Sequence, residues 1–290
     1  MEQTERYHSL DFLRATAMYL GVILHVTILF GSPDRILWNF YGEYYQDPID
    51  YQITWGIHLF RMQFFYLIAG FFAEMVYLKK GGKYFSLNRL KRILVPFIFG
   101  CLIIYPLTLG VFAVYNAELN GMSYLEQSLT FFLWECFSDT EYNPRITFVH
   151  FWFMWFLMIF YVIHVFGRIA FLGWIQKTKI SHFITCIVDY CIDKRCGVFL
   201  LAGVTFCFHI TVRSSIFLPD ESHLDAALND LAYYMVFYFF GVGLFHCKNF
   251  FSKIARNLKW NLLLILLFAC WIHEATDAVD IHRSPVVDIN

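Results

Sequence analysis

LDFLRATAMYLGVILHVTILF, residues 10–30, is an apolar stretch that carries Arg14 and His25 in its interior. A helix rises 1.5 Å per residue, so a stretch of about 20 residues crosses the hydrocarbon core of a bilayer. Eleven residues are close to three helical turns, which puts Arg14 and His25 on one face, roughly 16 Å apart along the axis. An ionisable residue at such depth is costly and by default marks a functional site. We therefore expect any mechanism to begin on this helix.

Composition extends this interpretation to the whole chain. The 290 residues are 59% hydrophobic and 16% charged, with a mean hydropathy of +0.52, whereas soluble domains average about 45–50% apolar and about 25% charged residues. We expect an all-α, polytopic transmembrane helix bundle. Its seven readable spans are Leu10–Phe30, Ile53–Leu78, Ile93–Tyr115, Phe148–Phe171, Val198–Leu218, Asn229–His246 and Leu258–Ile272.

Loop charges predict the orientation of this bundle. Loops 79–92 and 248–259 contain ten Lys or Arg and no acid, and loop 168–197 is also rich in basic residues. The intervening loops are acidic. Under the positive-inside rule the basic loops and the N-terminus are cytoplasmic. The same rule predicts that Ser181–Tyr190 does not cross the membrane, and Met122–Phe137 is too short and polar to cross and is typical of an interfacial helix.

His25 and Arg14 are the candidate catalytic residues. A neutral imidazole accepts a proton from a hydroxyl at physiological pH, as acyl transfer to an alcohol requires; the alternative is a histidine that only hydrogen-bonds between helices. Arg14 would bind an anion at the cytoplasmic mouth of the pocket that His25 closes. Its alternative is a snorkelling anchor paired with Asp11.

Two further groups of polar residues suggest binding sites. Arg89 and Arg92, three residues apart on a basic loop, have planar forks that suit the phosphates of a cosubstrate such as coenzyme A; an ordinary topology signal is the alternative. His58, Arg61 and His150 lie at the outer ends of their spans and suggest a substrate pocket, although such residues are common at interfaces. Cys186, Cys191 and Cys196 are five apart, a spacing that matches no zinc or redox motif, so we expect no metal.

These residues together resemble the type 3 membrane acyltransferase family. Arg14 and His25 match its R-x10-H pattern, and Arg89 and Arg92 match its R-x-x-R motif. The segments HLFRMQFFYLIAGFF from His58, HFWFMWFLMIFYV from His150 and YFFGVGLF from Tyr238 are also similar. Within the family the chain most resembles the members associated with succinylation of osmoregulated periplasmic glucans.

The resemblance implies a multi-pass inner-membrane enzyme with no bound cofactor and with acyl-CoA as cosubstrate. Arg89, Arg92 and Arg14 would hold the donor, and His25 would act on a glucan or other polysaccharide hydroxyl arriving from outside. The partners would be the donor, the glycan and the bilayer, with no nucleic acid. Residues 1–272 would form the acyltransferase domain and 273–290 a polar tail. Since family members have about ten spans, seven favour a truncated form. A transporter or flippase for an anionic or lipid-linked sugar, and an inactive fragment, are the rival hypotheses.

Overall fold

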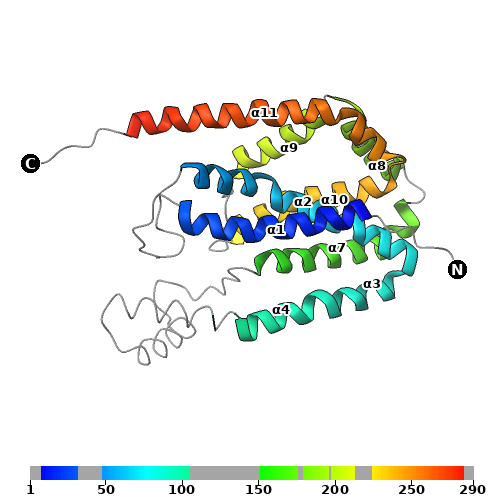
Figure 1. Cartoon of the computed structure of the whole chain (residues 1–290). Helices are drawn as coiled ribbons and strands as arrows, with labels where there is room; N and C mark the ends of the chain where they lie inside the picture. Colours follow the sequence, from blue (N-terminus) through cyan, green and yellow to red (C-terminus); the bar gives the residue numbers. More distant parts are fainter. Residues whose placement is uncertain are drawn as a thin grey trace, which may run out of the picture.

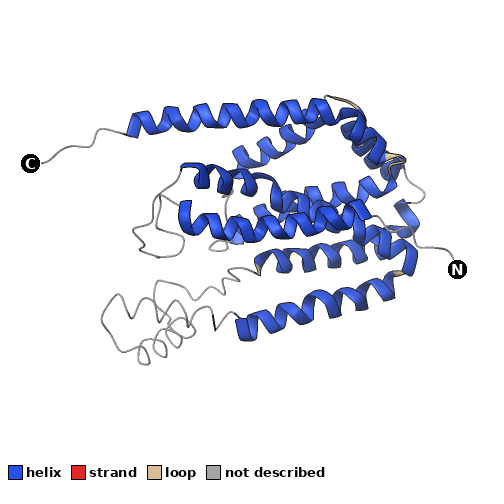
Figure 2. Ribbon diagram, in the orientation of Figure 1, coloured by secondary structure: helices blue, strands red, loops and turns tan. Residues whose placement is uncertain are grey.

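The computed structural model describes residues 8–31, 48–104, 107, 151–175, 179–195, 197–212 and 224–283. These residues form helices and short turns, with no strand among them (Figure 2). The α-helices are α1 (His8–Gly31), α2 (Pro48–Lys80), α3 (Gly82–Arg89), α4 (Val95–Phe99), α7 (Trp152–Ile175), α8 (Lys179–Asp193), α9 (Gly197–Val212), α10 (Leu224–His246) and α11 (Phe250–Arg283). The all-α prediction is therefore confirmed for the described part of the chain.

The predicted spans coincide with helices wherever the structure describes them. The predicted span Ile93–Tyr115 is described in part, within a continuous helical run that contains two π-helical segments, η1 (Leu90–Leu94) and η2 (Gly100–Ile104). The first π segment precedes Pro96, whose ring has no N–H and collides with the carbonyl four residues earlier, so the turn widens. Met122–Phe137 lies outside the described residues.

Two helices in the described part of the chain are long and apolar enough to cross a membrane, over Trp152–Ala170 of α7 and Leu228–His246 of α10. A shorter apolar helix covers Ala15–Leu24. The segment Ser181–Tyr190 falls within α8, whose 15 residues extend about 22 Å, too short to span. Seven spans remain a prediction, and the predicted non-crossing of Ser181–Tyr190 agrees with the length of α8.

Helix α2 lies at the centre of the bundle, packed against α1 and α10 (Figure 1). Two glycines allow the close approach of α2 and α10. A Cβ on Gly70 would collide with the backbone carbonyl of Tyr238, and one on Gly241 would collide with that of Leu67. Small residues at such crossings let the backbones of membrane helices come together. This crossing fixes the relative position of the polar side chains that α2 and α10 carry.

An aromatic core fills the space between α2, α7 and α10. Tyr66, Phe160 and Tyr238 are fully buried, and the rings of Tyr66 and Phe160 meet edge to face at 5.2 Å between centroids. Edge-to-face pairs of this kind add about 0.5–1.5 kcal/mol beyond the burial of their area. Trp152 and Phe156 extend the same cluster. This core holds the three helices together, and polar residues lie at both ends of it.

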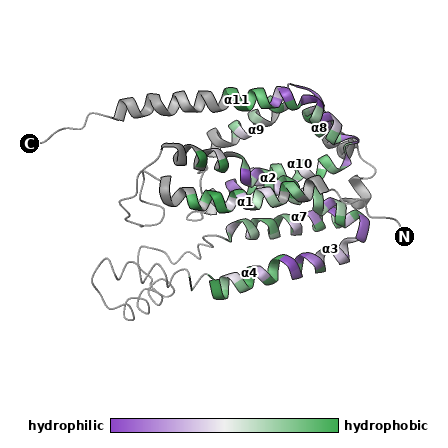
Figure 3. Cartoon of the chain, viewed as in Figure 1, coloured by the Kyte–Doolittle hydropathy of each residue, from purple (hydrophilic) through white to green (hydrophobic). Residues whose placement is uncertain are grey.

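The end of the bundle where α1, α3 and α11 begin and α2 and α10 end is called here the basic end (Figure 1). It carries Lys79, Lys80, Lys194, Arg195 and Lys248, and hydrophilic residues gather there on α3, α8 and the start of α11 (Figure 3). The gathering of basic residues at one end is the pattern that the loop charges predict.

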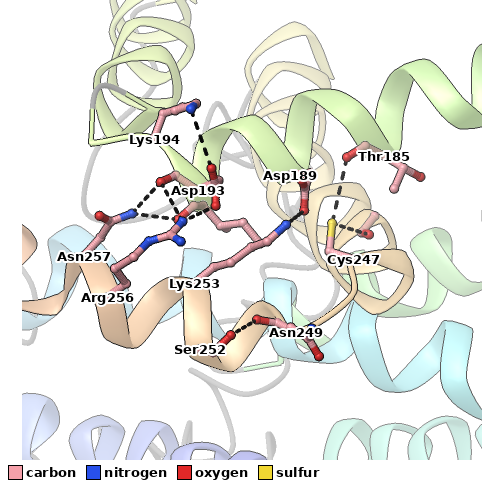
Figure 4. Close-up of polar contacts among 12 residues, drawn as sticks. Thr185, Asp189, Asp193, Lys194, Cys247, Asn249, Ser252, Lys253, Arg256 and Asn257 are labelled. Carbon is pink, nitrogen blue, oxygen red and sulfur yellow. Dashed lines mark hydrogen bonds and ion pairs between the residues drawn. The ribbon is translucent and has the colours of Figure 1, made fainter.

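Helix α8 is attached to α11 at the basic end by charged and amide side chains (Figure 4). Lys253 pairs with Asp189, and Arg256 pairs with Asp193. Asn257 donates to the backbone carbonyls of Ile192 and Asp193, at 3.0 and 2.9 Å. The hydrogen bond that Lys253 donates to the Asp189 carboxylate raises the pKa of Lys253 above its ordinary value. These contacts hold α8 across the end of the bundle.

Candidate functional site

A buried carboxylate joins three helices near the basic end. Glu74 of α2 has no exposed surface. Its Oε1 lies 2.7 Å from Nε2 of His246 on α10 and forms an ion pair with Arg168 of α7, while its Oε2 lies 3.2 Å from Nε2 of His164 on α7. A buried charge is tolerated only where it is paired and hydrogen-bonded. We call Glu74, His164, Arg168 and His246 the Glu74 cluster.

The Glu74 cluster runs from the surface into the core. The side chains of His246 and Arg168 are 38% and 26% exposed, whereas that of His164 is 2% exposed. Nδ1 of His164 lies 3.3 Å from the hydroxyl of Tyr238. Nε2 of His164 and Oε2 of Glu74 are in contact but make no hydrogen bond among the described residues, whereas Nδ1 can accept the Tyr238 O–H. The cluster thus connects the partly exposed Arg168 and His246 at the basic end to a tyrosine buried in the aromatic core.

Arg89 and Arg92 occupy different environments. The guanidinium of Arg89 is half-buried over the rings of Tyr161 and Phe85, at 4.9 and 5.2 Å from the centroids. Its Nε is buried without a hydrogen-bond partner among the described residues. Arg92 is exposed. A bidentate grip by neighbouring forks is therefore not preformed, and Arg89 instead faces α7, within electrostatic reach of His164.

Arg61 lies in a second polar group, farther along α2 from the basic end. Its guanidinium rests on Gly21 of α1, where a Cβ would collide with it. Gln63 donates to the Tyr233 hydroxyl of α10 at 3.0 Å, and Tyr234 is within electrostatic reach of Arg61. The Nε of Arg61 and the Oε1 of Gln63 are buried without hydrogen-bond partners among the described residues. This second polar group therefore has donors and an acceptor available to a polar ligand.

The remaining predicted site residues are placed only in part. Arg14 and His25 lie on α1 and His58 lies on α2, but their side chains are outside the described part of the structure, as is His150 altogether. Viewed down the axis of α1, positions 14 and 25 lie at angles between that of the buried Gly21 and that of the exposed Met18. Position 25 is one turn beyond the glycine that Arg61 contacts. No group of side chains that could hold a metal ion occurs among the described residues.

Sequence reasoning missed the Glu74 cluster. The available signal was an ionisable residue within each of several apolar segments, since Glu74, His164 and His246 all lie in predicted spans. Their partnership was not readable, because the contact between His246 and Glu74 joins residues 172 apart in the chain. Asp230, buried near Tyr233 and Tyr234 one turn further along α10, was also missed.

Comparison with known proteins identifies the family of this helical bundle. A family model described as an acyltransferase domain matches residues 7–275. The chain belongs to this acyltransferase family.

The similarity to individual curated proteins is lower and covers less of the chain. Glucans biosynthesis protein C of Escherichia coli strain SMS-3-5 is 28% identical over 102 residues, which are 32% of this chain and 23% of that protein. The K12 protein of the same name matches to the same extent. The matched segment thus spans less than a quarter of the length of these curated relatives. No solved structure matches the chain.

Proposed function

We propose that this chain is an integral-membrane O-acyltransferase. It moves an acetyl or succinyl group from cytoplasmic acyl-CoA to a hydroxyl of an extracytoplasmic glycan, such as a periplasmic glucan. The observation that carries the proposal is the family match across residues 7–275, which includes the helix that bears Arg14 and His25. The name of the relative, glucans biosynthesis protein C, supports a glucan acceptor.

The proposed reaction needs a base, a donor site and an acceptor site. His25 takes the proton of the acceptor hydroxyl as its oxygen attacks the thioester carbonyl. The tetrahedral intermediate collapses, the carbon–sulfur bond breaks, and the departing thiolate takes a proton from the imidazolium. Arg14, roughly 16 Å before His25 on the same helix, would bind the anionic donor at the cytoplasmic mouth of the pocket. Arg61, which rests on Gly21 one turn before His25, is suited to orient the acceptor, together with His58 and His150.

The donor site is proposed at the basic end. Arg89 and Arg92 lie there with the lysines of α2 and α3, and cations of this density attract the phosphates of coenzyme A. The proposed topology places this end in the cytoplasm, with the N-terminus inside and seven spans in an inner membrane. Under this arrangement the donor arrives from the basic end, and the acceptor arrives from the opposite one.

The deciding experiment is an acyl-transfer assay in proteoliposomes. The purified chain receives acyl-CoA on one side and a linear glucan on the other, and both free thiol and acylated glucan are measured. We expect His25→Ala to lower the rate by about 10²–10⁴-fold, the usual contribution of a general base. His209→Ala on α9 is the matched loss of an imidazole on another helix and should retain the rate.

The same assay separates the rival functions. A transporter or flippase would move labelled sugar across the vesicle without releasing coenzyme A. An inactive fragment would do neither. Retention of more than about a tenth of the activity in His25→Ala would contradict the general-base role.

A further inference from the structure

The guanidinium of Arg89 lies over two aromatic rings, those of Phe85 and Tyr161, and each of these rings packs against a further ring. Phe85 and Tyr161 meet edge to face, at 5.4 Å between centroids, beneath the guanidinium. Phe85 is fully buried and Tyr161 nearly so. A guanidinium over aromatic faces gains about 0.5–2 kcal/mol, more where water is excluded. The location of the Arg89 charge is therefore set by the location of these rings.

Both rings rest on the His164–Tyr238 pair. The Phe85 ring lies 5.7 Å from that of His164, tilted by 30°, and the Tyr161 ring lies 6.0 Å from that of Tyr238. His164 and Tyr238 are joined by the 3.3 Å contact between Nδ1 and the hydroxyl. A displacement of the imidazole would therefore shift both rings under Arg89, the Phe85 ring directly and the Tyr161 ring through Tyr238.

The imidazole lies in turn against Glu74. Nε2 of His164 is 3.2 Å from Oε2 of the carboxylate, a contact without a hydrogen bond, and the carboxylate is anchored on its other oxygen by Arg168 and His246. All of these groups lie on α2 and α7, apart from His246 on α10. Because Glu74 and His164 are buried, their electrostatic contacts are stronger than contacts at the protein surface. A continuous series of contacts therefore leads from Glu74 to Arg89.

We propose that Glu74 and His164 are positioning residues for Arg89. The carboxylate orients the imidazole, the imidazole and Tyr238 support the two rings, and the rings hold the guanidinium where the anionic acyl donor binds. The buried Nε of Arg89, with no partner among the described residues, is then a donor kept ready for a phosphate oxygen. This inference rests on the proposed donor site. It adds two residues, one of them fully buried, that never touch the donor.

The test compares steady-state constants for donor and acceptor in the proteoliposome assay. Arg89→Ala should raise the KM for acyl-CoA by about 10–100-fold, the loss of a hydrogen bond to a charged group. His164→Phe keeps a ring against Phe85 and Tyr238 but removes both polar contacts. We expect it to raise the donor KM by about 2- to 30-fold, the range for residues that act through a packed network, with the acceptor KM unchanged. Combined with Arg89→Ala, it should add nothing further.

Two further variants test the interpretation, one as a milder change within the contact series and one as a control outside it. Tyr238→Phe deletes one oxygen from the contact series, disturbs folding least, and should raise the donor KM in the same direction by less. Asp189→Asn removes a carboxylate that pairs with Lys253 at the same end but has no part in the series. It is the matched control, and its donor KM should be that of the parent.

The outcomes separate the inference from the proposed function. If Arg89→Ala raises the donor KM but His164→Phe and Tyr238→Phe leave it at the parent value, the positioning role is wrong and the donor site stands. If the effects of His164→Phe and Arg89→Ala simply multiply, the imidazole acts independently of Arg89, and the inference is again overturned. If Arg89→Ala itself changes nothing, the donor site is wrong, and the positioning role falls with it.

Discussion

Replacing Gly70 by alanine should destabilise the protein, although alanine is the better helix former. In an open helical position the exchange gains about 1 kcal/mol from propensity. At Gly70 the new Cβ would lie 2.9 Å from the carbonyl carbon of Tyr238 and closer still to its oxygen, so α2 and α10 would have to separate. Overpacking of this kind costs about 1–3 kcal/mol. The cost exceeds the gain over most of that range, and the sign of the effect reverses.

The structure supplies both a partner and a control for this variant. Gly241→Ala would meet the Leu67 carbonyl from the other side of the same crossing, while an alanine at Gly203 of α9 meets no atom within 4 Å. We expect the first to resemble Gly70→Ala and the second to match or exceed the parent. Because one crossing must open for either, the costs of Gly70→Ala and Gly241→Ala should combine to less than their sum.

Thermal unfolding of detergent-solubilised protein, followed by tryptophan fluorescence and size-exclusion chromatography, measures the effect. For a chain of this size each kcal/mol shifts Tm by roughly 2–4 °C, so a net loss of up to about 2 kcal/mol lowers Tm by up to roughly 8 °C. The crossing lies one turn from Glu74, and so the donor KM should rise in the same variants. A Gly70→Ala protein as stable as Gly203→Ala would refute the close approach of α2 and α10.

Three further predictions concern the basic end and the topology. Arg92→Ala should raise the donor KM with kcat unchanged, because an exposed phosphate contact is remote from the reacting carbonyl; a changed kcat in steady-state assays would contradict this role. Burial raises the pKa of Cys247 to about 11, so on a background without other cysteines its labelling by a maleimide should still increase at pH values where an ordinary thiol, with a pKa of about 8.5, has levelled off. Saturation near that lower pH would show an exposed thiol. A cysteine at Ser222 should react with an impermeant reagent in intact cells and one at Ser86 only after lysis, and the reverse pattern would invert the proposed topology.

Local patterns predicted the helices because each segment is a long apolar run bounded by charged residues, although in the described part only two helices have the length and composition of a span. The charge pattern also predicted that Ser181–Tyr190 does not cross, since a crossing there would have placed Lys194 and Arg195 outside, and the length of α8 agrees with this prediction. The orientation of Arg89 was not. Its sequence neighbours suggest a charged surface loop, and only the packing of α3 against α7 brings Tyr161, 72 residues away, beneath its guanidinium.

For the candidate site, too, features within one helix could be predicted from the sequence, whereas contacts between helices could not. Arg14 and His25 could be proposed from the sequence because both lie on one helix, where spacing alone fixes a shared face, and their roles stay predictions. The association of Arg61 with Gly21 and of Glu74 with His164 needs the relative placement of different helices. Such contacts depend on helix crossings set by small residues, which one sequence does not specify.

The positions of the two polar groups limit the route of an acyl group between them. Arg61 and Glu74 are 13 residues apart on α2, or about 20 Å along the helix. The fully buried rings of Tyr66 and Phe160 fill the interval between α2, α7 and α10. A thioester that enters at the basic end therefore does not reach the level of Arg61 through that interval.

The opposite side of α2, toward α1, is the route consistent with the proposed mechanism. There α1 presents the small residues Ala17 and Gly21, both buried against the bundle, and His25 follows one turn later. Binding of the donor phosphates at Arg89 and reaction at His25 are then separated by most of the depth of the bundle. A donor with a shortened thioester arm should therefore still compete with acyl-CoA for binding, because its phosphates are intact, yet transfer no acyl group. Competition and single-turnover assays measure the two steps separately. Transfer from the shortened donor at the parent rate would place the reacting carbonyl near the basic end and exclude His25 as its base.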